Sequence, residues 1–498
     1  MSHGMRERGK RWIRIHVTGA QARDLYYPCS ELPVAGRPTP SLELIGARRA
    51  PADLHVNGRP AGLLDVCRDG DRLMVALAPG VLVLPGENVV SLPVRCDPDA
   101  VHIFAAPQPG LGWGSLAAVG PVLSDRHLEA SVRFLQASLS RDPFGPGLSS
   151  LTAWDQQRGC VRLWSWYWTT GIVYEALALL HDELAPAVEL ENELAGLESG
   201  LLGRQDTSTG PARGSYFVRW DPDRRHAGGI QAWHAPNDAA FLGLHGLLAA
   251  HRRTGHEMWL DRAVLLADWI WRRGVVGDRL RVGWNAVTGE WDDTWHYIDA
   301  AWTPAFFLAL AHRTGIPEYE ERAVALARDT IARFATDGPF YLKIWRSNGR
   351  HTRTVFARGM AWVLEGWVPL VASGQDWLLP RVRELVIGLL DHQRPDGAWP
   401  YLLDRPSTGP CNKGTPAIAC HLQRAAPLVP ELADRISATV SRALGWCEAQ
   451  MDLDPASPAH GGIFAHNVEG AISTVRDIPV AFNYASAYYI LARRERKS

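Results

Sequence analysis

The sequence predicts an all-α (α/α)6 barrel, a six-hairpin toroid, preceded by a small antiparallel β-sandwich domain. Three observations predict this fold: short strand-like runs near the N-terminus, a repeated pair of helices after about residue 125, and a regular difference between the two helices of each pair. We place the β-sandwich in residues 1–122 and the barrel in residues 123–498.

The N-terminal region carries turn signals between short β-rich runs. "ADLHVNGRPAG" alternates apolar and polar residues up to Asn57-Gly58, a dipeptide typical of a hairpin turn. The following runs are interrupted by the Pro-Gly pairs at 79–80 and 85–86. Strands this short and close together are typical of a small antiparallel sandwich.

A helical repeat occupies the rest of the chain. The stretch "NDAAFLGLHGLLAAHRRTG" (237–255) parallels "IDAAWTPAFFLALAHRTG" (298–315), and each precedes a second helix. Further helices of this first type are predicted at 169–182, 358–374, 414–428 and 483–494. All six are apolar almost all round, which indicates helices buried on every side and therefore an inner ring.

The partner helices are amphipathic. Trp259, Ala263, Leu266 and Ile270 form one apolar stripe. Tyr319, Ala323, Leu326 and Phe334 repeat this pattern in the next pair. Six buried helices alternating with six half-exposed ones predict two concentric layers.

Composition excludes some classes of function. With 52 Lys and Arg against 53 Asp and Glu, the net charge is -1, so no basic excess favours nucleic acid as a partner. No apolar run reaches about 18 residues, which argues against a membrane span. Seven scattered cysteines and no evident signal segment indicate a cytoplasmic protein. The 21 Trp residues are compatible with carbohydrate binding, although large helical cores also use tryptophan.

Two aspartates stand at equivalent places in the repeat. Asp238 and Asp299 lie at or near the start of an inner helix, as do Arg358 and Thr415. All inner helices of such a ring run in the same direction, so these residues should converge on one mouth, with neighbouring helices about 8–10 Å apart. Each aspartate could instead have a structural role, because an acid at a helix start can cap the helix and interact favourably with the helix dipole. Asn237 could cap the first helix by itself, and aromatic and histidine neighbours flank both acids, so we predict a catalytic pair.

Other polar and aromatic residues are expected at the same mouth. They come from the segments that lead into the inner helices: Trp168, His234, Trp295, His296, Lys343, Arg358, Trp399 and Lys413. Arginine and lysine pair with carboxylates, so this set favours a small anionic oligosaccharide as the substrate. The histidines lack metal-binding spacing, and no metal or other cofactor is expected.

Residues from about 125 to 498 resemble the unsaturated glucuronyl and rhamnogalacturonyl hydrolases, glycoside hydrolase families 88 and 105. The resemblance is carried by "WSWYWTTGIVYEAL", "HAPNDAAF", "HYIDAAW", "FARGMAW", "HQRPDGAWPYLLD", "KGTPAIA" and "ASAYYILA". It implies an (α/α)6 barrel that hydrates the C4=C5 double bond of an unsaturated terminal uronide in a polysaccharide fragment. Lys343 occupies the loop in which that family commonly has a histidine.

The resemblance also implies roles for individual residues. Asp299 would donate the proton to C4 and activate water, while Asp238 would raise the pKa of its partner carboxyl group. Arg358 and Trp362 would help to form the sugar pocket, and Trp168 would be a stacking platform.

Three other functions stay open at this stage. A direct glycosidase could use the two acids in an inverting mechanism, which needs carboxyl groups roughly 6.5–9.5 Å apart. A sugar isomerase or lyase could occupy the same barrel. A non-catalytic sugar-binding protein would hold its ligand without turnover. The sequence does not indicate an oligomeric state.

Overall fold

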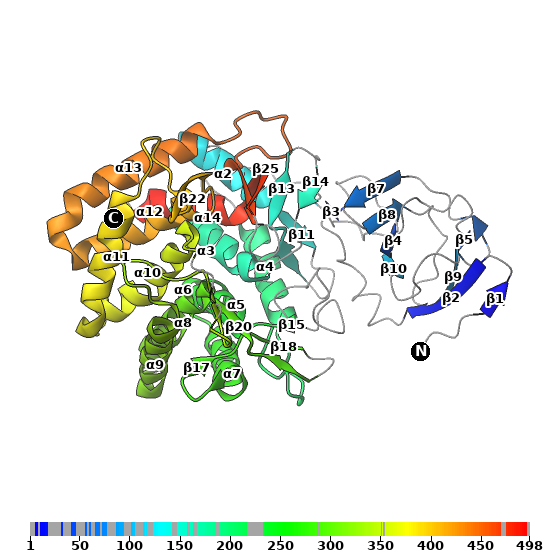
Figure 1. The fold of residues 1–498 in the computed structure, drawn as a ribbon, viewed down its shortest axis with the longest axis horizontal. Coiled ribbons are helices and arrows are strands. Elements are labelled where there is room, and N and C mark those ends of the chain that lie inside the picture. Colours follow the sequence, from blue (N-terminus) through cyan, green and yellow to red (C-terminus); the bar gives the residue numbers. More distant parts are fainter. Residues whose placement is uncertain are drawn as a thin grey trace.

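The computed structural model describes residues 113–495 apart from 115, 117–122, 142–146, 157–159, 163–166, 185–189, 217–232, 286–288, 350, 352–353 and 470–474. Before residue 113 it describes the backbone of the strands. The chain forms strands first and helices afterwards, and the helices make up most of the fold (Figure 1).

Two antiparallel sheets occupy the N-terminal region, in agreement with the predicted β-sandwich. The five-stranded sheet has the order β1 (Met5–Glu7), β2 (Lys10–Val17), β9 (Gly86–Pro93), β5 (His55–Val56), β6 (Arg59–Pro60). The four-stranded sheet has the order β10 (Val101–Phe104), β4 (Ser41–Ile45), β8 (Arg72–Ala76), β7 (Asp65–Asp69). Strands β5 and β6 pair antiparallel on either side of the Asn57-Gly58 dipeptide, which itself lies outside the described residues.

Six inner helical segments form a ring in the described part of the chain. Their bounds are α3 (Tyr167–Leu184), α5 (Pro236–Leu242) continuing through η2 (Gly243–Leu247) and α6 (Leu248–Thr254), η3 (Ile298–Trp302) continuing as α8 (Thr303–Thr314), α10 (Ala357–Ala372), α12 (Gly414–Ala425) and α14 (Asn483–Glu495). Helix α14 packs against both α12 and α3, so the last inner helix closes the ring on the first. All six predicted inner helices are confirmed.

An outer layer covers this ring. It consists of α2 (Arg126–Ala137), α4 (Glu191–Arg204), α7 (Glu257–Gly274), α9 (Pro317–Phe334), α11 (Leu379–Asp391) and α13 (Ala433–Ala449). The predicted stripes on α7 and α9 are buried, whereas the inner helix α10 is buried almost all round. Inner and outer layers therefore share one continuous apolar core.

The way in which two inner helices end explains the Thr-Gly dipeptide that their repeats share. Helices α6 and α8 both end at a glycine in the left-handed conformation, Gly255 with φ 67° and Gly315 with φ 70°. Glycine has no Cβ to clash in this conformation, so the shared Thr-Gly ends both helices in the same way.

Short strands occur between the helices, where the sequence predicts none. A five-stranded sheet has the order β24 (Phe464–Glu469), β25 (Val475–Phe482), β13 (Ala153–Asp155), β14 (Cys160–Arg162), β3 (Glu31–Leu32). Hairpins and small sheets add β11 (Leu139–Arg141), β12 (Leu148–Ser150), β15 (Trp233–His234), β16 (Val275–Val276), β17 (Arg279–Leu280), β18 (Gly283–Asn285), β19 (Trp291–Asp292), β20 (Trp295–Tyr297), β21 (Ile344–Arg346), β22 (Pro400–Leu402) and β23 (Arg405–Pro410). Several of these strands lead into the inner helices and so position the rim of the barrel.

Candidate active site

The first aspartate lies in the first turn of α5. The helix begins at Pro236 after Ala235, and no side chain caps it. Asp238 is 3% exposed, and Asn237 Nδ2 donates a hydrogen bond to Asp238 Oδ1 at 3.3 Å. The prediction that Asn237 caps this helix is therefore wrong. Proline is favoured at the first helical position, so the N-cap is Ala235 and the helix starts two residues earlier than a cap at Asn237 would allow.

The second aspartate lies in the first turn of η3. This short 3-10 helix begins at Ile298 and follows Tyr297, whose side chain does not cap it. Asp299 is half-buried among residues that are fully buried. Asp238 is thus the third residue of its helix and Asp299 the second, so both acids lie in the first turns of two consecutive inner segments and neither is an N-cap.

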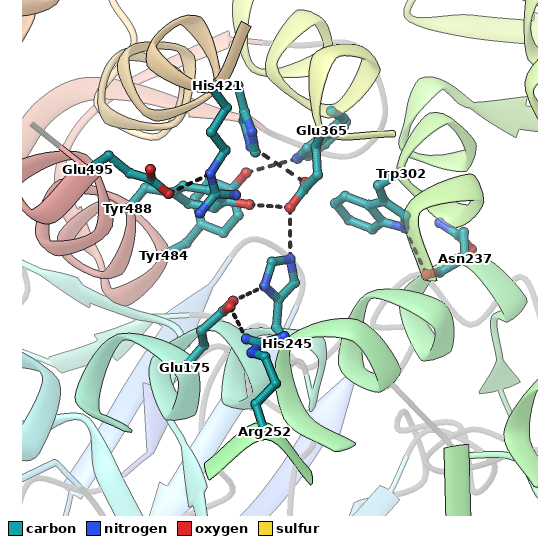
Figure 2. Close-up of polar contacts among 12 residues, drawn as sticks. Glu175, Asn237, His245, Arg252, Trp302, Glu365, His421, Tyr484, Tyr488 and Glu495 are labelled. Carbon is teal, nitrogen blue, oxygen red and sulfur yellow. Dashed lines mark hydrogen bonds and ion pairs between the residues drawn. The ribbon is translucent and has the colours of Figure 1, made fainter. Parts of the chain in front are cut away.

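The two helix starts lie side by side. The indole Nε1 of Trp302, three residues after Asp299, donates a hydrogen bond to the backbone oxygen of Asn237 at 2.8 Å (Figure 2). The Trp302 ring also packs against Phe241, with ring centroids 4.4 Å apart. These contacts bring the two aspartate-bearing turns to one rim of the barrel, although the aspartates are 61 residues apart in sequence.

Aromatic rings fill the barrel directly below this rim. Trp168 packs edge-on against Phe241 at 5.5 Å and Tyr484 at 5.4 Å, and its ring lies 5.7 Å from Trp302. Trp362 packs edge-on against Trp302 at 4.8 Å. The predicted residues Trp168 and Trp362 therefore belong to one aromatic floor, contributed by α3, α5, η3, α10 and α14.

Two cations flank one aromatic ring at the rim. The Arg358 guanidinium carbon lies 4.5 Å from the Trp362 ring and 5.6 Å from the Phe356 ring. Lys343 Nζ lies 5.5 Å from the same Phe356 ring and 5.7 Å from the Tyr297 ring. Lys343 is 3% exposed and Arg358 is 8% exposed, so both charges lie in a protected environment where they interact strongly with an anion.

A third cation lies beside these two. Lys413 Nζ lies 4.1 Å from the Phe482 ring, just before the start of α14. Burial raises the pKa of the Cys411 thiol, and the positive charges of Lys413 and Arg358 act on the same thiol in the opposite direction. A Cβ built at Gly414, the residue after Lys413, would lie 3.0 Å from the Arg358 backbone nitrogen and 3.0 Å from Cys411 Sγ, so the start of α12 packs against the start of α10 beside Arg358.

The two predicted histidines have structural partners of their own. The ring Nδ1 of His234 lies 2.8 Å from Ser215 Oγ, and burial lowers the pKa of His234 to about 4. Both ring nitrogens of His296 lie 3.1 Å from backbone oxygens, those of Tyr297 and Arg281. Burial lowers the pKa of His296 to about 3. Both rings are therefore neutral near pH 7, and these contacts do not join them to the aromatic floor.

Two predicted tryptophans also lie outside the floor. Trp399 is fully buried, and its Nε1 donates to the backbone oxygen of Leu389 on the outer helix α11 at 2.8 Å. Trp295 is half-buried, and its Nε1 donates to Asp292 Oδ2 at 3.0 Å. Trp399 therefore contacts the outer layer, and Trp295 of β20 bonds back to β19, a strand of a different small sheet.

Sequence reasoning missed Tyr297 and Phe356. The Tyr297 ring packs edge-on against Phe356 at 5.3 Å and lies 6.0 Å from Trp362. The sequence could have revealed Tyr297, because neighbouring residues of a strand point to opposite faces and Tyr297 follows His296 directly. In β20, Tyr297 contacts the rim aromatics while His296, one residue earlier, packs against Phe334 of the outer helix α9.

The described residues contain no group of three or more His, Cys, Asp or Glu side chains arranged to hold a metal ion. In the same part of the chain, no helix is both long enough and apolar enough to cross a bilayer.

The class of fold is a six-hairpin helical barrel, and solved structures of this class are similar to the chain. An unsaturated glucuronyl hydrolase specific for heparin matches with a TM-score of 0.55 and 16% identity, over 74% of this chain and 95% of that one. An unsaturated glucuronyl hydrolase from Bacillus sp. GL1, responsible for glycosaminoglycan degradation, matches with a TM-score of 0.56 and 17% identity, over 75% and 96%.

A possible member of the GH105 family from Klebsiella pneumoniae matches with a TM-score of 0.53 and 16% identity, over 77% of this chain and 96% of that one. No family profile matches the sequence, and no curated protein is similar to it in sequence. At these identities the likeness shows a shared fold.

Proposed function

We propose that this protein is a glycoside hydrolase that acts on uronic-acid-containing oligosaccharides. The observation that carries the proposal is the hydrogen bond from Trp302 to Asn237, which joins the two aspartate-bearing turns at one rim. The fold shared with unsaturated glucuronyl hydrolases supports the substrate class. One similar structure is described with the oligosaccharide dGlcA-Glc-Rha-Glc, which fits a substrate of several sugar units.

The proposed reaction is hydration of the C4=C5 double bond of an unsaturated terminal uronide. Asp299 donates a proton to C4, water adds at C5, and the resulting hemiketal opens and releases the neighbouring sugar. Asp238 acts as the partner carboxylate, because a nearby negative charge raises the pKa of an acid that must hold a proton near neutral pH. Both acids lie in the first turns of adjacent inner segments, and this supports a role in which the charge of Asp238 acts on the carboxyl group of Asp299.

The three rim cations account for an anionic substrate. Lys343, Arg358 and Lys413 are all buried beside aromatic rings. A uronate carboxylate would form charge-assisted hydrogen bonds with such donors, while the sugar face would lie on Trp168 or Trp362. We also place the activity in the cytoplasm, where the buried thiols of Cys411, Cys420 and Cys447 would stay reduced.

The test is incubation with unsaturated uronide disaccharides while the ultraviolet absorbance of the enol ether is followed. The proposal expects loss of absorbance with release of the second sugar, and incorporation of oxygen from labelled water. Unchanged absorbance over a broad panel of such disaccharides would remove this reaction. Release of sugar from saturated glycosides would instead identify a direct glycosidase, conversion without water uptake an isomerase or lyase, and binding without turnover a sugar-binding protein.

A further inference from the structure

The hairpin that leads into the second aspartate has two faces with different surroundings. Strands β20 and β21 form this hairpin, and their register pairs six residues: Trp295 with Arg346, His296 with Trp345, and Tyr297 with Ile344. Opposite residues of an antiparallel pair project from the same face, whereas consecutive residues of one strand project from opposite faces. His296 and Trp345 therefore share one face of the hairpin, and the other four residues share the second.

The first of these faces points to the outer layer. His296 packs edge-on against Phe334 of the outer helix α9, with ring centroids 6.4 Å apart. The Trp345 ring lies 5.4 Å from the guanidinium carbon of Arg333, which belongs to the same helix. The hairpin therefore rests on α9 through the face that carries His296 and Trp345.

The second face points to the mouth of the barrel. Tyr297 packs edge-on against the rim residue Phe356 at 5.3 Å, and its ring lies 6.0 Å from Trp362. Trp295 and Arg346 project from the same face, one step further along the hairpin from the second aspartate. Two residues of a strand span about 7 Å. Trp295 and Arg346 are therefore placed beside the mouth and outside the aromatic floor.

Hydrogen bonds hold the Trp295 indole in one orientation. Its Nε1 donates to Asp292 Oδ2 at 3.0 Å. The other carboxylate oxygen, Asp292 Oδ1, accepts from the backbone nitrogen of Thr294 at 2.9 Å and from its hydroxyl at 2.7 Å. Trp295 is half-buried, so part of the ring stays accessible while its polar edge is bonded. A ring fixed in this way loses little conformational freedom when a sugar packs on its face.

Arg346 adds a positive charge that forms no ion pair in the described part of the chain. The residue is partly exposed, and its backbone nitrogen donates to His351 Nδ1 at 3.0 Å. The acids that precede β20 have partners of their own. Asp293 accepts from the Arg281 guanidinium at 2.9 to 3.2 Å, and Asp292 holds Trp295. The charge of Arg346 is therefore available to an anion that enters the mouth.

We propose that Trp295 and Arg346 form a second sugar subsite, in which the indole face of Trp295 supports the sugar joined to the terminal uronide and Arg346 binds an anionic substituent of that sugar. The planar guanidinium fits the oxygens of a carboxylate or of a sulfate ester. This inference rests on the proposed function, because it takes the aspartate pair as the place of the terminal uronide. The protein then selects fragments by the charge of the second sugar as well as by that of the first.

The matched variants are Arg346→Met and Arg279→Met. Arg279 is also partly exposed and also forms no ion pair among the described residues. Its guanidinium carbon lies 6.0 Å from the Trp345 ring, so it contacts the face of the hairpin that rests on α9. A general effect of removing a cation beside this hairpin should therefore be the same in both variants.

The first readout is binding, measured by calorimetry with four ligands. They are glucuronate, glucuronate joined to a neutral N-acetylhexosamine, the same disaccharide with a sulfate ester on the second sugar, and glucuronate joined to a second glucuronate. Arg346→Met is expected to weaken binding of a ligand with a charged second sugar about tenfold and to leave the first two ligands unchanged. A loss confined to the sulfated or to the carboxylated ligand identifies which anion Arg346 binds. Arg279→Met is expected to bind all four as the parent does.

The second readout separates the ring from the charge. Trp295→Leu is expected to weaken binding of all three disaccharides about fivefold and to leave glucuronate unchanged. Added salt screens a partly exposed charge, so it should reduce the preference of the parent for a charged second sugar. Arg346→Met should show no such preference at any salt concentration, and it remains a complete test if Trp295→Leu does not fold.

Two results overturn the inference: equal affinity of the parent for neutral and charged second sugars, or equal losses in Arg346→Met and Arg279→Met. A parent protein that binds the disaccharides in the expected pattern but leaves unsaturated disaccharides unchanged refutes the proposed reaction and supports the subsite. Conversion of unsaturated disaccharides with a kcat/KM that is independent of the charge on the second sugar supports the reaction and overturns the subsite.

Discussion

Residue by residue, the rim combines cations with aromatic rings. Lys343 is the clearest example, because its Nζ lies near two rings and the residue is almost fully buried. Its backbone oxygen also accepts a hydrogen bond from the Ile298 amide at 3.1 Å, directly before Asp299. Lys343 is thus bound to the segment that carries the proposed proton donor.

Lys343→Met keeps the length of the side chain and removes its charge. We expect it to weaken binding of glucuronate about tenfold, since one charge-assisted hydrogen bond to the carboxylate is lost, and to leave binding of a neutral sugar unchanged. Calorimetry with both ligands measures this. Arg383→Met is the control, because Arg383 is an exposed cation on the outer helix α11. Equal loss of affinity for both sugars would contradict the assignment.

The sequence predicts which residues are near the rim better than it predicts where their side chains point. Trp168, Arg358 and Trp362 belong to the floor and rim, whereas His296 and Trp399 bond to backbone oxygens on the side facing the outer layer. Side-chain direction depends on where a short strand begins, and a two- or three-residue strand has too little pattern to reveal this. The pair of aspartates could be found because helix repeats mark equivalent positions.

At the level of elements, α10 packs backbone to backbone against η3. A Cβ at position 366 would lie 1.8 Å from the backbone oxygen of Ala301, so only glycine permits this approach. Ala301 belongs to the same short helix as Asp299. The contact therefore fixes the depth at which the second aspartate lies in the barrel.

Gly366→Ala is expected to destabilise the fold by about 1–3 kcal/mol, because η3 must move to admit the methyl group. Its matched control is Gly445→Ala in α13, where a Cβ would meet no atom within 4 Å. That substitution is expected to stabilise the fold by about 0.5–1 kcal/mol, since alanine favours helix over glycine. Denaturant unfolding measures both, and the same sign of change in the two variants would refute this packing argument.

The elements themselves were largely predictable. Inner helices are apolar all round and outer helices have one apolar stripe, so a period of 3.6 residues separates the two layers in the sequence. The strands β13, β14 and β25 were not predicted, because each is paired through contacts distant in sequence. Strand β3, from the N-terminal region, extends the same sheet, so a boundary after residue 122 does not separate the two regions completely.

At the scale of the whole molecule, four buried histidines of the described residues contribute to the dependence of stability on pH, together with buried acids such as Glu175, whose pKa is lowered to about 2. Burial lowers the pKa of His234 to about 4 and those of His296 and His421 to about 3. In the unfolded chain these rings take up protons near pH 6.5, whereas in the folded protein they stay neutral until the pH is much lower. Their contribution to stability is therefore full above about pH 6.5 and is lost as the pH falls, by about 1.4 kcal/mol per pH unit for each histidine.

His245 has the opposite dependence. Its pKa of about 9 lies above the unfolded value, so its contribution is full below about pH 6.5 and is lost as the pH rises through 9. We expect the thermal unfolding midpoint to be highest between about pH 6 and pH 7 and to fall on both sides. Calorimetric scans across this range measure it. His245→Gln should remove most of the fall on the alkaline side, and a fall that stays unchanged in this variant would contradict the charge assignment.

The most direct test of the whole account compares Asp238→Asn and Asp299→Asn with Asp376→Asn, an exposed acid in the first turn of the outer 3-10 helix η4 (Asp376–Leu378). We predict that either rim variant lowers the rate of enol-ether loss by about 10²–10⁴-fold while glucuronate still binds, and that Asp376→Asn retains the parent rate. Full turnover by either rim variant would contradict the claim that the two aspartates form one catalytic site.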